Sequence, residues 1–449
     1  MVIRGTETRP RIKTSIPGPE AKKLVRRDDR ALATTTKTAP VAGLRGRGVV
    51  VEDVDGNVFL DFAAGIGVLN TGHCHPHVVK AVQEQAARLM HFAGTDYYYE
   101  PQVELAERLG AIAPVVGKQR KVFYTNSGAE ANEAAIKFAK HNTGRHRFLA
   151  FLGAFHGRTM GALSLTASKD VQRRGYFPGM PGVTHVPFPN PYRNLWGIDG
   201  YSEPEELSNR AIDFIEHLFS WNVPQDEVAA LFWEPVQGEG GYVVPPRMFP
   251  GALRRLCDEN GILLVADEVQ TGFGRTGKMF GAEHFGVEAD VVSVAKAMGS
   301  GLPVGASVVR ADLDFETKGS HSNTYGGNPV ACAAGIATLD VIEDEGLIQN
   351  SAERGAQMGK HLDEMKDRYA SIGDHRGLGL MRAIEFVRRD GSPDPKLRDR
   401  VETEAWKRGL LLLGCGKSGI RFIPPLVVKD AQVDGAMDVL RESLKAAKA

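Results

Sequence analysis

The central part of the chain alternates between two patterns of hydrophobic positions. Between about residues 100 and 310, short β-rich runs alternate with stretches in which apolar residues recur at helical spacing. Several of the runs are apolar at every position, as in strands that are buried on both faces. This alternation predicts an α/β fold in which six or more strands form one large, mostly parallel sheet. The runs expected to be strands are 122–125, 148–152, 228–233, 262–266, 290–294 and 306–309.

Boundary residues mark two of the expected helices. Ser202 and Glu205 have the spacing of a capping box, and apolar residues then follow on one helical face, which predicts a helix over 203–219. Asn328 followed by Pro329 predicts an N-cap and a first helical position, from which a long apolar-striped helix begins. We expect this second helix to link two lobes of the molecule.

The two ends of the chain differ from the centre. Near the N-terminus, residues 55–57 have turn character and separate two short strand-like runs, which predicts a hairpin. After about residue 370, strand-like runs at 380–386 and 410–413 accompany a helix near 396–408 and a final helix after Lys429. We therefore expect a small α+β domain, shared by both ends, beside a large central domain. The expected division is 1–75 for the N-terminal arm and part of the small domain, 76–328 for the large central domain, and 329–449 for the linking helix and C-terminal small domain.

Charge and composition narrow the class of protein. The 449 residues carry 55 basic and 55 acidic side chains, a balance that does not favour nucleic acid or an anionic membrane as a partner. With 42% hydrophobic and 24% charged residues, the composition is that of a folded globular protein. No apolar run approaches the roughly 18 residues of a membrane-spanning helix, and the first residues hold no apolar signal core. Because the four cysteines show neither zinc-site nor disulfide spacing, we expect a cytoplasmic protein.

An acid and a lysine each lie at the end of an expected buried strand. Asp267 follows the run 262–266, and Lys296 follows the run 290–294 after one alanine. Ligands of α/β sheets bind outside the carboxyl ends of the strands, so both side chains are expected in one crevice. A lysine there can form a Schiff base with an aldehyde, while a carboxylate can pair with a protonated ring nitrogen, as pyridoxal phosphate requires. Taken alone, such a pair is more often a structural ion pair, but the neighbouring motifs reverse that preference.

Two polar turns offer phosphate contacts. Ser127, Gly128 and Ala129 end a strand and begin a helix, and the free backbone N–H groups of a helix start bind anions. An ordinary serine N-cap has the same pattern, so this motif gains weight only from its neighbours. The glycine-rich loop 322–328, which contains Thr324, could supply a second phosphate contact.

Three further motifs supply candidate aromatic and charged groups. Phe155 could stack on a flat cofactor while Arg158 faces an anionic substrate, although a plain surface arginine is the alternative. Glu234 and Glu239 lie in a glycine-rich loop after a strand, where a cleft wall is a better interpretation than solvated loop charges. Arg421 stands between apolar neighbours, where an unpaired guanidinium is costly, so we expect a carboxylate partner from Glu239 or from a ligand.

Together these motifs resemble those of the class III, or omega, aminotransferases, which are pyridoxal-phosphate enzymes of fold type I. The resemblance implies an α/β fold with a mostly parallel seven-stranded sheet in the large domain, a small α+β domain, and pyridoxal 5'-phosphate as the cofactor. It extends from about residue 50 to 425 and rests on seven motifs in the family's order. These are 61–73, Ser127-Gly128-Ala129, Phe155-His156-Gly157-Arg158, 234–241, 267–272, Lys296 and Thr324.

The resemblance also implies a role for each of these residues. Lys296 would carry the cofactor and move the substrate proton, and Asp267 would hold the ring nitrogen. Thr324 would come from the other subunit of a homodimer, and whether dimers pair into a tetramer stays open. The residues implied for cofactor binding are Ser127, Gly128, Ala129, Phe155, His156, Glu234, Asp267, Val269, Gln270, Lys296 and Thr324, and those implied for substrate binding are Ile66, Arg158, Glu239 and Arg421.

Within the family, this chain is most similar to the 4-aminobutyrate aminotransferases. There, the position of Arg158 binds the far carboxylate of the substrate, and the position of Arg421 binds the α-carboxylate of glutamate or 2-oxoglutarate. The position of Glu239 neutralises that second arginine when 4-aminobutyrate is bound. The resemblance therefore implies a ping-pong transfer of the amino group from an ω-amino acid, 4-aminobutyrate first, to 2-oxoglutarate, giving succinate semialdehyde and glutamate.

Sibling activities within the family remain open. Ornithine and acetylornithine aminotransferases have similar arginine and glutamate positions, and 5-aminovalerate is a further possible donor. The segment 190–201 resembles archaeal members, some of which are amino-acid racemases or epimerases. Those racemases lack the counterparts of Arg158 and Glu239, which favours transamination for this chain. A binding protein without activity is disfavoured because Lys296 and Asp267 are both present.

Overall fold

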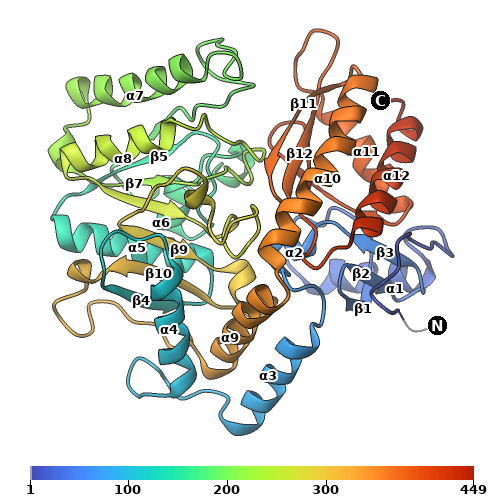
Figure 1. Ribbon diagram of the computed structural model, residues 1–449, viewed down its shortest axis with the longest axis horizontal. Helices are drawn as coiled ribbons and strands as arrows, with labels where there is room; N and C mark the ends of the chain where they lie inside the picture. Colours follow the sequence, from blue (N-terminus) through green and yellow to red (C-terminus); the bar gives the residue numbers. More distant parts are fainter. Residues whose placement is uncertain (1–2) are drawn as a thin grey trace.

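The structure is a computed structural model that describes residues 3–449. A seven-stranded sheet forms the centre of its larger part (Figure 1), in the order β4-β10-β9-β8-β7-β5-β6. β10 pairs antiparallel with both neighbours, while the four pairs from β9 to β6 are parallel. The expected mostly parallel sheet of seven strands is confirmed. The strands are β4 Arg120–Thr125, β10 Gly305–Arg310, β9 Val291–Val294, β8 Leu263–Asp267, β7 Val228–Trp233, β5 Arg147–Phe151 and β6 Val183–Val186.

Six of these strands coincide with the expected runs, and β6 was not expected. β6 lies at the edge of the sheet and three of its four residues are only partly buried. An edge strand of this kind carries no continuous apolar run, so hydrophobic pattern alone does not reveal it. By contrast, β7, β8 and β9 are buried at every position because both faces of the sheet are covered.

Alternate residues of the central strands belong to two different cores. Leu231 and Trp233 of β7 pack in the main hydrophobic cluster, while Ala230 and Phe232 pack in a second cluster together with residues of α5. Helices therefore lie on both faces of the sheet (Figure 1). The helices of this part are α3 Pro76–Arg88, α4 Glu100–Ile112, α5 Gly128–Thr143, α6 Met160–Leu165, α7 Pro204–Trp221, α8 Phe249–Asn260 and α9 Pro329–Asp344. Short 3-10 helices are η1 Asp170–Gln172, η2 Gln225–Glu227, η3 Gly281–His284, η4 Lys296–Gly299 and η5 Ala311–Leu313.

Both helices predicted from boundary residues are present. The side chain of Asn328 accepts a hydrogen bond from the Ala331 amide at 2.9 Å, so the expected N-cap of α9 is confirmed. The capping box expected before α7 is wrong. The N-cap is Glu203, which makes no side-chain cap, and the Ser202 hydroxyl instead donates to the Asp199 carbonyl oxygen. Ser202 lies one residue too early, so its side chain satisfies the preceding turn.

The smaller part contains two four-stranded sheets and both ends of the chain (Figure 1). The expected hairpin is confirmed, since β2 and β3 pair antiparallel around residues 55–57. The run 410–413 was expected as one strand, but it divides into β13 and β14, which belong to different sheets. β13 pairs with the N-terminal strand β3, and the exact domain boundaries stay a prediction. The strands are β1 Gly43–Arg47, β2 Val50–Asp53, β3 Val58–Asp61, β13 Leu410–Leu411 in one sheet and β11 Ile372–Leu378, β12 Met381–Phe386, β15 Gly419–Phe422, β14 Leu413–Cys415 in the other.

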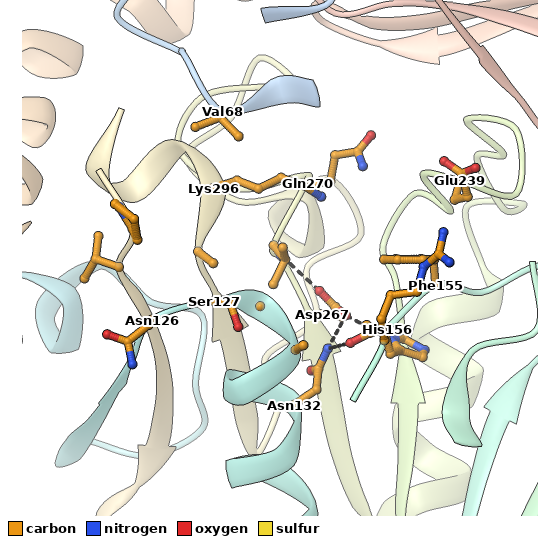
Figure 2. A pocket seen from close by; sticks show the side chains of 18 of the residues that line it. Val68, Asn126, Ser127, Asn132, Phe155, His156, Glu239, Asp267, Gln270 and Lys296 are labelled. Atoms are coloured by element: carbon orange, nitrogen blue, oxygen red, sulfur yellow. Dashed lines mark hydrogen bonds and ion pairs between the residues drawn. The ribbon is translucent and has the colours of Figure 1, made fainter. Parts of the chain in front are cut away.

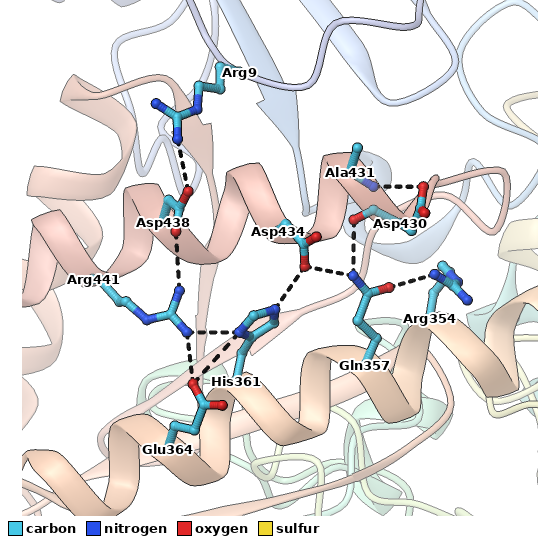
Figure 3. Close-up of polar contacts among 10 residues, drawn as sticks. All are labelled: Arg9, Arg354, Gln357, His361, Glu364, Asp430, Ala431, Asp434, Asp438 and Arg441. Carbon is cyan, nitrogen blue, oxygen red and sulfur yellow. Dashed lines mark hydrogen bonds and ion pairs between the residues drawn. The ribbon is translucent and has the colours of Figure 1, made fainter.

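Polar contacts join the last helix to its neighbours (Figure 3). On α10, Nδ1 of His361 accepts from Nη2 of Arg441 at 2.7 Å, and Nε2 of His361 contacts Oδ1 of Asp434 at 2.9 Å; both partners lie on α12. Arg9 of the N-terminal arm pairs with Asp438 of α12 at 2.9 Å. No helix within residues 3–449 has the length and apolar character needed to cross a bilayer. The helices of this part are α1 Pro19–Ala31, α2 Ala64–Gly67, α10 Leu347–Arg368, α11 Pro395–Lys407 and α12 Asp430–Ala446.

Candidate active site

The predicted chemical residues lie where strands of the large sheet end. Asp267 is the last residue of β8, and Lys296 follows β9 after one residue. Ser127 follows β4 and stands at the start of α5. Because β8 and β9 are parallel, and β4 runs in the same direction as β9 through the antiparallel β10, these ends share one edge of the sheet. This is the edge at which α/β sheets bind ligands.

A cavity of about 450 Å³ lies at this edge (Figure 2). Twelve of the predicted residues line it: Ser127, Gly128, Ala129, Phe155, His156, Arg158, Glu234, Glu239, Asp267, Val269, Gln270 and Lys296. An adjoining cavity of about 550 Å³ shares five of them and is also lined by Ile66 and Arg421. Thr324 is exposed and lines neither cavity. A single chain therefore brings together all of the predicted site residues except Thr324.

Asp267 is the centre of a buried hydrogen-bond network (Figure 2). Its Oδ2 atom accepts from the Nδ2 of Asn132 at 2.7 Å and contacts Nδ1 of His156 at 2.8 Å. Its Oδ1 atom accepts from the Val269 amide at 3.1 Å. Burial alone lowers the pKa of His156, but the Asp267 carboxylate outweighs burial and raises it. The network fixes a negative carboxylate at the floor of the cavity, because donated hydrogen bonds stabilise its charge.

Lys296 combines burial with an unusual backbone conformation. Its φ is 42°, in the left-handed region that a residue with a β-carbon rarely adopts. Strained residues of this kind cluster at functional sites. Burial lowers the pKa of the Lys296 amine, with Asp267 opposing that shift and Arg421 adding to it. A lowered pKa enlarges the neutral fraction of the amine, which is the form that attacks carbonyl groups.

The start of α5 forms one wall of the cavity. The Ser127 side chain accepts from the Glu130 amide at 3.2 Å, so the serine caps this 16-residue helix. The amides of Gly128 and Ala129 precede the first helical hydrogen bond, and the positive end of the helix dipole lies with them. A β-carbon at Gly128 would lie 2.7 Å from Cγ1 of Val269, so only glycine fits at this turn. The wall is suited to an anion.

Glu234 is a buried carboxyl behind the cavity. Its two oxygens accept from the Phe155 amide and the Gly238 amide, each at 2.9 Å. Burial raises the pKa of Glu234 to about 7, with the nearby His156 lowering it and Asp267 raising it. These bonds fix the loop that carries Phe155 relative to the loop after β7, so this acid holds two walls of the site together.

Among the charged residues that line the adjoining cavity are Arg158, Arg421 and Glu239. Arg421 contacts Glu239 with Nη2 to Oε2 at 3.2 Å, and Lys169 contacts the other oxygen of Glu239 at 2.6 Å. Burial raises the pKa of Glu239, but Arg421 and Lys169 outweigh burial and lower it. The guanidinium of Arg158 lies 5.8 Å from the ring centre of Phe155. The carboxylate partner expected for Arg421 is thus Glu239 in this structure.

Asn132 and Lys169 are among the site residues that were not found from the sequence, and each contacts a predicted residue. Asn132 lies one turn into α5 and is buried, and its polar side chain on the apolar face of that helix was a usable signal. Lys169 is half-buried in the loop before η1, and nothing in its local sequence distinguishes it from lysines on the surface. It reaches Glu239 only through the tertiary fold.

The fold, the lysine and the helix start define a class of protein, and the family comparison agrees. The family model "Aminotransferase class-III" matches residues 32–444. The chain therefore belongs to the class III aminotransferases, which are enzymes that use pyridoxal phosphate. The resemblance seen in the sequence is confirmed at the level of family, fold and cofactor.

Relatives of known name differ in the reaction that they catalyse. The chain is 44% identical to an alanine/serine racemase from Pyrococcus horikoshii over 97% of this chain and 93% of the relative. It is 40% identical to a probable 4-aminobutyrate aminotransferase from Bacillus subtilis, over 90% of this chain and 92% of the relative. An acetylornithine aminotransferase from Archaeoglobus fulgidus is 39% identical over 93% of this chain and 99% of the relative.

Solved structures have the same fold. An amine transaminase from an uncultivated Pseudomonas species, determined in its PLP-bound form, superposes with a TM-score of 0.86. The two are 32% identical, and the alignment covers 93% of this chain and 98% of that one.

The cavity residues fit pyridoxal phosphate. The cofactor presents an anionic phosphate, a ring nitrogen, a ring hydroxyl and an aldehyde, and the cavity offers a helix start, Asp267, Gln270 and Lys296 at its walls. Three buried polar atoms there have no hydrogen-bond partner among the described residues: Oε1 of Gln270, Nε2 of His156 and Oδ1 of Asn132. Buried polar atoms without partners are costly, and the bound cofactor brings polar groups to this cavity.

Proposed function

We propose that this protein is an ω-aminotransferase that transfers the amino group of 4-aminobutyrate to 2-oxoglutarate and forms succinate semialdehyde and glutamate. The contact between Glu239 and Arg421 carries the proposal. With Glu239 on Arg421, the arginine is neutralised and a substrate with one carboxylate can use Arg158. When a dicarboxylate binds, its second carboxylate takes the place of Glu239 on Arg421.

The energetics support an exchangeable partner for Arg421. Its side chain is only 8% exposed. Breaking a buried ion pair by removing one partner costs about 3–5 kcal/mol, because a buried charge is left without compensation. A pocket that accepts both one and two carboxylates therefore needs a protein carboxylate that can leave the arginine, and Glu239 is placed to be that group.

The residues around the cofactor have proposed tasks. Pyridoxal phosphate supplies an aldehyde that accepts the amino group and a ring that withdraws electrons from the substrate carbon. Asp267 holds the protonated ring nitrogen, and Gln270 holds the ring hydroxyl. Lys296 would hold the cofactor through its aldehyde, and the amine of Lys296 would move a proton at the substrate carbon. Phe155 stacks on the ring, and His156 orients Asp267.

Phosphate binding is proposed to require two subunits. The helix start at Ser127, Gly128 and Ala129 holds one side of the phosphate. Thr324 is exposed on its own chain, and we propose that Thr324 of the partner subunit completes the phosphate site in a homodimer. Val269 packs against Gly128 and Ile66 lines the substrate entrance.

Two other reactions remain candidates for specific reasons. Racemisation of an α-amino acid is a candidate because of the likeness to an alanine/serine racemase. Such a reaction uses one carboxylate and gives no task to the exchange between Glu239 and Arg421. Transfer from acetylornithine is a candidate because of the likeness to an acetylornithine aminotransferase. Ornithine and acetylornithine are longer than 4-aminobutyrate and carry a nitrogen substituent beside the carboxylate.

The test is a single half-reaction with three amino donors. The cofactor-loaded protein is mixed, without any keto acid, with 4-aminobutyrate, acetylornithine or L-alanine. The visible absorbance of the cofactor is followed together with the chirality of the alanine. Lys296→Ala is the matched control, because it retains the pocket and removes the proton-moving amine.

Each outcome assigns the reaction. Conversion of the cofactor from its aldehyde form to its amine form with 4-aminobutyrate, absent in the control, is the expected result. A response to acetylornithine alone would reassign the donor. Alanine that loses its chirality while the aldehyde absorbance persists would refute transamination as the main activity and establish racemisation.

A further inference from the structure

Glu239 contacts two cations from two different parts of the chain. Arg421 comes from β15, and Lys169 comes from the loop before η1. Each cation takes its own oxygen, since Lys169 Nζ lies 2.6 Å from Oε1 and Arg421 Nη2 lies 3.2 Å from Oε2. The glutamate side chain is 18% exposed and the lysine side chain is 32% exposed. Lys169 therefore lies nearer to solvent than Arg421 does, at the rim of the same cavity.

When Glu239 releases Arg421, its carboxylate needs another positively charged partner, and Lys169 can be that partner. If Glu239 left Arg421 and had no other partner, a largely buried carboxylate would lose its compensating charge. That loss would oppose the binding of every substrate that needs Arg421. With Lys169 already at hydrogen-bond distance, Glu239 can let go of the arginine and keep one ion pair. Lys296 also lowers the pKa of Glu239, but its effect is smaller than those of Arg421 and Lys169. In addition, the amine of Lys296 is needed for proton transfer.

We propose that Lys169 is the alternative partner of Glu239, a specificity-determining residue that lets the pocket accept dicarboxylates. The inference rests on the proposed exchange between Glu239 and a substrate carboxylate at Arg421. Lys169 is a positioning residue in this scheme, because it acts through Glu239 and does not touch the substrate. Its effect is accordingly selective: it favours glutamate and 2-oxoglutarate and leaves ligands with one carboxylate nearly unaffected.

Selective binding is measured with two unreactive ligands. Glutarate has the two carboxylates of 2-oxoglutarate, and butyrate has the single carboxylate of 4-aminobutyrate. Isothermal titration of the cofactor-loaded protein gives the dissociation constant of each, independently of turnover. The variants are Lys169→Met, which removes the cation, and Lys169→Arg, which retains it. Lys169→Gln serves if the methionine variant does not fold.

A control variant distinguishes loss of the contact between Lys169 and Glu239 from the general effect of removing one positive charge. Arg174 lies in the same region, is exposed and pairs with Asp170 rather than with Glu239. Arg174→Met removes one positive charge without removing a partner of the glutamate. We expect Lys169→Met to weaken glutarate roughly tenfold, since the pair is intermediate between surface and buried pairs. Butyrate should change less than twofold, and Lys169→Arg should restore glutarate binding.

The outcomes distinguish the inference from the function on which it rests. Equal weakening of glutarate and butyrate would mean that Lys169 binds the shared carboxylate directly, and would overturn the proposal. The proposal for Lys169 would also be overturned if Lys169→Met left glutarate binding unchanged, or if Arg174→Met weakened glutarate binding as much as Lys169→Met does. Either result would leave the proposed transamination intact. A wild-type protein that does not bind glutarate at all would overturn both.

Discussion

Replacement of Asn132 by leucine should weaken cofactor binding although Asn132 does not need to touch the cofactor. Its Nδ2 donates to Oδ2 of Asp267 at 2.7 Å and to the His156 carbonyl oxygen at 2.8 Å. Leucine has a similar volume and no donor, so Asn132→Leu removes both bonds while filling the space. Asp267 then retains His156 and the Val269 amide as partners.

The expected magnitude follows from these bonds. A hydrogen bond to a charged group contributes about 1.5–3 kcal/mol, and one to a neutral carbonyl contributes about 1 kcal/mol. Part of the loss is offset, because Oδ1 of Asn132 is buried without a partner and the leucine removes that cost. We expect the apo protein to lose roughly 2 kcal/mol of stability. Because the carboxylate of Asp267 is less well held, we expect cofactor affinity to fall roughly tenfold, or about 1.4 kcal/mol.

Two measurements and a matched control test this. The dissociation constant of pyridoxal phosphate is obtained by titrating apo protein, and the apo stability by denaturant unfolding. Asn142 offers the control, since it lies on the same helix and its Nδ2 donates to the carbonyl oxygens of Phe138 at 2.9 Å and Leu313 at 2.7 Å. Asn142→Leu should lower stability comparably and leave cofactor affinity unchanged. The reasoning fails if Asn132→Leu binds the cofactor as the wild type does, or if both variants lose affinity equally.

Two further predictions concern stability. Gly355→Ala should destabilise the protein by about 1–3 kcal/mol, because the added β-carbon would lie 2.1 Å from the carbonyl oxygen of Gly379. Gly110→Ala should be tolerated, because the nearest atom to its β-carbon would be 3.9 Å away. Equal melting temperatures for the two variants would contradict this prediction. Burial raises the pKa of Glu268 from 4.5 to about 7, so its contribution to stability is lost as pH rises across that window. The stability difference between wild type and Glu268→Gln should therefore shrink from pH 5 to pH 8, and a constant difference in urea unfolding would refute the cause.

Hydrophobic pattern predicted the parts of the fold that are buried on both sides. β7, β8 and β9 are apolar at every position because helices cover both faces of the sheet. The pattern failed where burial is partial or where a short apolar run serves two sheets. β6 lies at an edge, and 410–413 divides between β13 and β14. Which sheet a short run joins is decided by contacts distant in sequence, and local pattern does not contain them.

The candidate site was predictable to the extent that it lies at strand ends. Asp267 and Lys296 each end a recognisable buried strand, so the sequence alone placed both at one edge. To predict Asn132 as a site residue, one would have to know which face of α5 lies against the site. Lys169 could not be predicted, since its role depends on a contact with Glu239, 70 residues away. Polar pairs across loops are a product of tertiary structure.

Overall identity does not choose between transamination and racemisation for this chain. Both reactions need the same sheet, the same helix start and the same lysine. The reactions differ in whether the pocket must exchange a substrate carboxylate for a protein carboxylate. A racemase binds substrate and product through the same single carboxylate, so a glutamate held between Arg421 and Lys169 has no task in it. This argument supports the proposed transamination despite the 44% identity to a racemase.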